Sequence, residues 1–97
     1  MLTKAQIRTT VEAVLQKVQS ISGRDCPVLD DATKPIGDLD EFDSLMAVEA
    51  TVILEGELGC RLSDETPFIA REAGRKRALT IAEAVDRIYE KIATRAA

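Results

Sequence analysis

Ser44 is the residue whose type and setting best suit chemistry, in the run Phe42-Asp43-Ser44-Leu45. It opens a stretch with helical apolar spacing, and the free N–H groups and dipole at a helix start favour an anion such as a phosphodiester. The chain has no histidine, so the usual general base for a serine or cysteine nucleophile is missing. Ser44 is therefore better suited to accept a group from another enzyme than to attack a substrate.

A structural role would also account for this run of residues. Asp43 or Ser44 must lie at or near the N-cap of the helix, and capping alone explains either residue. The tripeptide Asp-Ser-Leu is short, and it is not specific by itself. Both interpretations, a cap and an acceptor, stay open at this point.

The helix that Ser44 opens, residues 44–58, has two apolar stripes, whereas a surface helix usually buries one. The first stripe has small members that suit close packing against other helices. It comprises Ala47, Ala50, Thr51, Leu54 and Leu58. The second stripe has Glu49 and Glu55 at its edges, as a surface offered to a partner would have. It comprises Leu45, Val48 and Val52. The alternative is a central helix that is buried all round.

Two more helices are indicated near the ends of the chain. Thr3 can cap a first helix that runs to about Ser20, with Gly23 as its stop. Thr80 and Glu83 form a capping box that opens the last helix. The apolar stripe of the first helix comprises Ile7, Val11, Val14, Leu15, Val18 and Ile21. The stripe of the last helix comprises Ile81, Val85, Ile88, Tyr89 and Ile92.

The middle of the chain holds a long connection and a shorter helical signal. Residues 23–43 form the connection, and so long a loop in a small domain is often functional. Pro67 is expected to open a short third helix that Gly74 ends. Apolar residues make up 45% of the 97 residues, with three aromatics and few glycines or prolines. We therefore expect a single all-α domain over residues 1–97, with an aliphatic core.

Charge is unevenly distributed along the sequence. From Asp38 to Glu65 there are nine acids and one base, a net charge of −8, whereas the whole chain carries −4. The acidic segment favours basic partner proteins and disfavours nucleic acid. A basic segment runs from Arg71 to Arg77. It is either a solvated loop or a docking element for one dedicated partner.

Several classes of site are disfavoured by composition. Cys26 and Cys60 do not form a Cys-x-x-Cys pair, and without histidine no usual metal site is expected. The two cysteines are best interpreted as ordinary thiols. The sequence contains no run of 18 apolar residues, so no membrane span is predicted. The residues after Met1 lack the apolar core of a signal peptide. We expect a cytoplasmic protein that does not insert into membranes.

The stretch from Phe42 to Gly59 resembles the second helix of acyl carrier proteins. That family has Asp-Ser-Leu at the helix start, then an apolar residue and a glutamate four and five positions beyond the serine, here Val48-Glu49. A Glu-x-Glu-apolar ending follows, here Glu55 to Leu58. The resemblance is specific over about residues 38–65 and looser elsewhere.

The resemblance implies an up-and-down four-helix bundle with a long first loop and a short third helix. It implies that Ser44 receives 4′-phosphopantetheine from coenzyme A through a separate phosphopantetheinyl transferase, and that Asp43 places the serine and contacts this transferase. The arm would hold an acyl or aminoacyl group as a thioester for enzymes of fatty-acid, polyketide or other specialised biosynthesis. The face read by these partners comprises Leu45, Val48, Glu49, Val52 and Glu55. The carrier would have no catalytic residues and would be a monomer.

The chain departs from the family pattern before the serine. Glu41 stands three residues before Ser44, where the family usually has glycine, and the Asp38–Ser44 stretch looks one residue longer. We therefore expect the turn before the helix to be built differently. The competing hypothesis is an unmodified helical module that binds a partner helix in a groove. A small enzyme is disfavoured because no base–nucleophile pair is visible.

Overall fold

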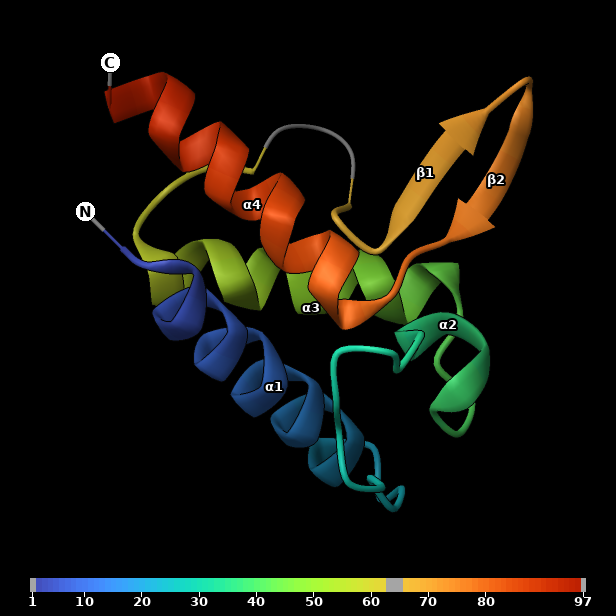
Figure 1. Cartoon of the computed structure of the whole chain (residues 1–97). Helices are drawn as coiled ribbons and strands as arrows, with labels where there is room; N and C mark the ends of the chain where they lie inside the picture. The colour runs from blue at the N-terminus through green and yellow to red at the C-terminus, as the bar shows by residue number, and fades with distance from the viewer. Residues whose placement is uncertain (1, 63–65, 97) are drawn as a thin grey trace.

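The computed structural model describes residues 2–62 and 66–96, and side chains only as far as residue 93. Asp64 and Glu65, which close the acidic run, lie outside the described residues. The described elements are three long helices, one short helical segment and a two-stranded sheet (Figure 1). In chain order they are α1 (Lys4–Ile21), α2 (Pro35–Asp38), α3 (Ser44–Leu58), β1 (Ile69–Glu72), β2 (Arg75–Ala78) and α4 (Ile81–Ala96).

The first helix, α1, begins and ends close to where its caps predict. The Thr3 hydroxyl accepts a hydrogen bond from the Gln6 N–H, and the Gln6 side chain accepts one from the Thr3 N–H, at 3.1 and 2.9 Å. Gly23 follows the helix with φ +73°, the left-handed conformation of a helix stop. The predicted stripe is buried at Ile7, Val11, Val14, Leu15 and Val18. The prediction is wrong for Ile21, which is 73% exposed because it is the last residue of the helix and extends past the packed part.

The last helix, α4, also follows its sequence signals. The Thr80 N–H donates to the Glu83 carboxylate at 3.0 Å, and the Glu83 N–H donates to the Thr80 hydroxyl at 3.2 Å. The hydrogen bond from the Thr80 backbone, and then the Arg77 guanidinium, hold the pKa of Glu83 below its usual value. The predicted stripe is fully buried at Ile81, Val85 and Ile88 and half-buried at Tyr89 and Ile92.

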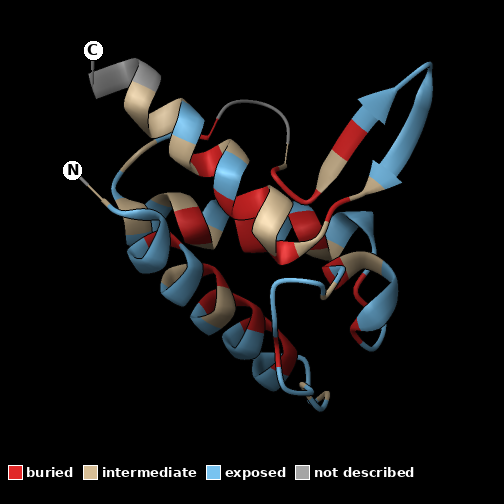
Figure 2. Cartoon of the chain, viewed as in Figure 1, coloured by how far each residue is buried: buried red, intermediate tan, exposed pale blue. Residues whose placement is uncertain are grey.

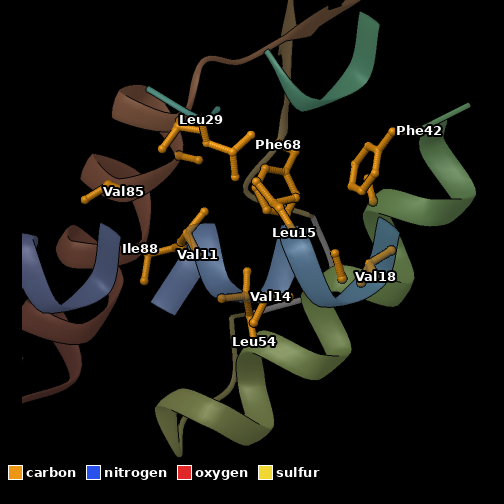
Figure 3. Packing of buried hydrophobic residues seen from close by; sticks show 14 of the residues in the cluster. Val11, Val14, Leu15, Val18, Leu29, Phe42, Leu54, Phe68, Val85 and Ile88 are labelled. Carbon is orange, nitrogen blue, oxygen red and sulfur yellow. The ribbon is translucent and has the colours of Figure 1, made fainter. Parts of the chain in front are cut away.

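The core lies where α1 packs against both α3 and α4. Figure 2 shows buried residues on the facing sides of these helices and exposed residues on their outer sides. In Figure 3, α1 side chains meet Leu54 of α3 and Ile88 of α4. The rings of Phe42 and Phe68 meet edge to face, with centroids 6.2 Å apart and planes at 86°. Because Phe42 lies two residues before Ser44, this contact fixes the loop before α3 to the core.

The predicted short third helix after Pro67 is wrong. The chain there forms an antiparallel hairpin, in which Glu72 of β1 pairs with Arg75 of β2. The two-residue turn between them is Ala73-Gly74, with φ +49° and +76°. Positive φ at both central residues matches the right-handed twist of paired strands. The described chain is thus mostly helical with a small sheet. It does not confirm an up-and-down four-helix bundle, because only three of its helices are long and the remaining one, α2, has four residues.

The turn of the hairpin gives a first testable prediction. Ala73 holds a left-handed conformation that costs an L-residue about 1–2 kcal/mol, and asparagine tolerates it better. Ala73→Asn is therefore expected to raise the free energy of unfolding by about 0.5–1 kcal/mol, measured by urea denaturation. Ala13→Asn, on the exposed face of α1, is the control and should lower it by about 0.5 kcal/mol. Equal destabilisation by both variants would contradict the left-handed conformation of Ala73 in the turn.

Candidate functional site

Buried side chains anchor the loop that leads to Ser44. Leu39 and Phe42 are each 3% exposed, and Pro35 at the start of α2 is buried. Asp40 and Glu41, between two of these anchors, and Asp43, directly after Phe42, are exposed to solvent. The apolar anchors hold the loop against the core, and the acids remain at the surface.

Asp43 is the N-cap of α3, and Ser44 is its first helical residue. The Asp43 carboxylate accepts a hydrogen bond from the Met46 N–H at 3.0 Å, and its carbonyl accepts one from the Ala47 N–H. Ser44 is exposed, and no residue in the described part of the chain bonds to its hydroxyl. The cap predicted at Asp43 or Ser44 is thus formed by Asp43, and the Ser44 hydroxyl stays available.

Two polar side chains near the end of α1 hold the loop before Ser44. Buried Gln19 donates from Nε2 to the Asp40 carbonyl at 2.9 Å. Arg24 donates from Nε to the Glu41 carboxylate at 2.7 Å. Sequence reasoning missed both residues. A signal existed for Gln19, because it continues the four-residue spacing of the buried stripe from Leu15, and a buried amide needs a polar partner.

Glu41 carries the unusual backbone of this loop. Its φ is +51°, in the left-handed region that glycine adopts without strain. The glycine of the family pattern is thus replaced by a residue that still takes a glycine-like conformation. Its carboxylate adds the bond to Arg24, whose side chain is 25% exposed. Glu41 thus combines a left-handed backbone with an ion pair to the end of α1.

A pair of substitutions tests the backbone at Glu41. Glu41→Gly and Glu41→Ala both remove the ion pair with Arg24, worth about 0–1 kcal/mol at a surface. Only glycine relieves the left-handed strain, so Glu41→Gly should be the more stable of the two by about 1 kcal/mol in urea denaturation. If residue 41 were in a helix or an extended loop, Glu41→Ala would be at least as stable as Glu41→Gly. A measurement of that order would show that residue 41 does not hold a positive φ.

The helix α3 has the two faces that its sequence predicts. Its packing side is buried at Ala47, Ala50, Thr51 and Leu54. Its other side exposes three large apolar side chains. These are Leu45, 67% exposed, Val48, 52%, and Val52, 62%. We call these three residues the apolar face. The alternative of a helix buried all round is therefore wrong.

The two glutamates at the edges of the apolar face differ in their surroundings. Glu49 is exposed. Glu55 is half-buried, and its carboxylate accepts a hydrogen bond from the Leu62 N–H at 2.9 Å. Glu55 therefore fixes the chain that leaves α3, a role that sequence reasoning missed. An open hollow lined by Val52, Glu55 and Cys60 lies beside this end of the face.

Other kinds of site have little support in the structure. Cys26 and Cys60 are free, and burial raises the pKa of the Cys26 thiol, which lowers its reactivity. Among residues 2–62 and 66–96, no group of three or more metal-ligating side chains gathers. None of the described helices is long and apolar enough to cross a membrane.

Comparison with known proteins identifies the family of this chain. The family model described as a phosphopantetheine attachment site matches residues 12–67, which is more than half of the chain and includes all of α3. No curated protein and no solved structure matches the chain significantly. Members of the family carry a 4′-phosphopantetheine prosthetic group and work with modifying and acyl-handling enzymes. The chain therefore belongs to the phosphopantetheine attachment site family, and 4′-phosphopantetheine is its prosthetic group.

Proposed function

We propose that this protein is an acyl carrier and that Ser44 is the residue that receives phosphopantetheine from coenzyme A. The observation that carries the proposal is the combination at the start of α3. Ser44 is exposed there with its hydroxyl unbonded within the described chain, because Asp43 supplies the cap. The apolar face begins at the next residue, Leu45. A modified serine would thus stand beside a surface that a partner enzyme can cover.

The start of α3 suits a phosphodiester on Ser44. The first N–H groups of a helix have no partner within the helix, and they favour an anion together with the helix dipole. Asp43 occupies the N–H of Met46, so the N–H groups of Ser44 and Leu45 are left for the phosphate. Exposure of Ser44 gives a separate transferase access to the hydroxyl, and no base of the chain's own is required.

The residues around the serine take distinct roles in this proposal. Asp43 places Ser44 by fixing the first turn of α3, and its exposed carboxylate offers a contact to the transferase. The apolar face and Glu49 form the surface that partner enzymes contact. Glu55 belongs to the same surface at its far end, where it also orders the chain after α3. The exposed acids favour partners with basic surfaces.

Family members are not catalytic themselves, and we propose the same for this chain. When attached, the arm supplies a thiol that carries an acyl or aminoacyl group as a thioester. The protein then contributes recognition, and partner enzymes of fatty-acid, polyketide or other specialised biosynthesis contribute the chemistry. A monomeric state and a cytoplasmic location stay predictions from the sequence.

Incubation with coenzyme A and a broad-specificity phosphopantetheinyl transferase tests the proposal. The intact-protein mass should rise by one phosphopantetheine group. The competing function is an unmodified helical module, which the exposed apolar face would also serve. If several transferases leave the mass unchanged, that second function is supported and the carrier function is not.

A further inference from the structure

The hairpin β1–β2 concentrates positive charge on a part of the molecule that projects from the helices. Arg71, Arg75, Lys76 and Arg77 are all exposed, and the one acid among residues 69–78 is Glu72. Figure 2 shows the hairpin extending beyond the helices with most of its surface exposed. The hairpin therefore carries a net charge of +3 in a chain whose total is −4.

One face of the hairpin carries two cations, Arg75 and Arg77, and one acid, Glu72. Residues directly opposite in an antiparallel pair share a face, so the pairs Ala70–Arg77 and Glu72–Arg75 lie together. Arg77 donates to Glu72 at 3.0 Å and to Glu83 of α4 at 3.1 Å. These bonds tie the hairpin to the start of α4 and occupy the Arg77 guanidinium.

The other face does not balance its charge. There Arg71 lies directly opposite Lys76, and opposite residues have Cβ atoms about 4.5–5.5 Å apart. Like charges in this position destabilise a sheet. Within the part of the chain that the structure describes, no carboxylate forms an ion pair with either side chain. Arg71 and Lys76 do not contribute to the buried packing of the hairpin, because Ala70 is the only buried residue among residues 69–72 and 75–78.

The hairpin stands at the same end of the molecule as Ser44. The short segment α2 contacts both β2 and α3, and α3 starts six residues after α2 ends. In Figure 1 the hairpin and the N-terminal end of α3 lie on the same side of the view. The segment α2 therefore links the hairpin to the helix that Ser44 opens.

We propose that Arg71 and Lys76 form a second docking surface, for a protein partner that presents paired carboxylates. Carboxylates between the two cations would remove their repulsion and form charge-assisted hydrogen bonds with both. A nucleic acid is disfavoured, because residues 38–49 at the same end carry five acids and no base and would repel a polyphosphate. A protein surface can place acids at the hairpin and bases at α3.

A titration of the ¹⁵N-labelled chain without its arm tests this surface, and it does not depend on whether Ser44 can be modified. The probe is a short synthetic peptide of alternating glutamate and alanine, followed by NMR at low ionic strength. The peptide should shift the amide signals of Arg71 and Lys76. The double variant Arg71→Gln/Lys76→Gln should weaken binding about fivefold or more. Lys17→Gln/Arg61→Gln has the same net charge and an intact hairpin, and it should bind like the wild type.

A stability measurement separates docking from folding. Arg71→Glu places an acid opposite Lys76, so it should raise the melting temperature while abolishing the peptide-induced shifts. A lower melting temperature would show that the two cations do not repel each other in the folded chain, and it would overturn the inference. The inference would also fail if the peptide shifts the signals of other amides instead of those of the hairpin. It would fail as well if oligothymidine binds the hairpin with higher affinity than the peptide does.

Discussion

Ser44→Ala is expected to abolish phosphopantetheine attachment completely while changing the free energy of unfolding by less than about 0.5 kcal/mol. The loss is complete because the attacking hydroxyl is removed. The stability is unchanged because Asp43, and not Ser44, accepts the capping hydrogen bond from Met46. Alanine also favours the helical conformation at least as well as serine does. The variant should therefore fold normally and fail only as an acceptor.

Two measurements check this result on the same samples. Intact mass after incubation with coenzyme A and a transferase reports the modification, and urea denaturation reports the stability. Ser20→Ala is the control. It removes a different exposed serine, which lies on α1, and should keep the full mass increase. A mass increase on Ser44→Ala would move the attachment site elsewhere. A loss of 1–2 kcal/mol would show that Ser44 contributes to the cap after all.

Val48→Lys is expected to lower the kcat/KM of the transferase reaction about tenfold or more, with little change in stability. Val48 is 52% exposed on the apolar face, so its replacement removes little burial, and lysine is the better helix former. A cation there faces the basic partner that the surrounding acids favour, and it disrupts the centre of an apolar contact. The free energy of unfolding should stay within about 0.5 kcal/mol of the wild type.

The matched control for this variant is Val28→Lys. Val28 is 94% exposed in the long connection between α1 and α2, so the substitution changes the same residue type and charge away from the apolar face. It should leave kcat/KM unchanged. If the two variants behave alike, the transferase responds to net charge and not to the face. A fall in kcat alone would place Val48 in the chemistry and not in recognition.

Local signals in the sequence predict the long helices of this fold well. Thr3 and the Thr80–Glu83 pair are caps that act within three residues, and the 3.6-residue spacing reports burial directly. The hairpin was missed because its strands have four residues each, too few for a clear alternation. Its turn is Ala-Gly instead of the usual Asn-Gly, and Pro67 gives a helix-start signal that the tertiary structure overrides.

The candidate site was also predictable from the sequence only in part. Asp43, Ser44 and the apolar face follow from the local pattern of one helix. The contacts that hold the preceding loop do not, since Gln19 and Arg24 reach residues 21 and 17 positions away. No periodicity reports such a pairing. The bond of Glu55 to Leu62 likewise depends on how the chain turns after α3, which its sequence does not reveal.

The attachment of the arm to Ser44 is tested most directly by peptide mapping of the modified wild-type protein. Trypsin cleaves after Arg24 and Arg61, and Ser44 is the only serine in between. Tandem mass spectrometry of this peptide should locate one phosphopantetheine on Ser44. An adduct on any other residue, with Ser44 unmodified, would contradict the assignment of the exposed first residue of α3 as the acceptor.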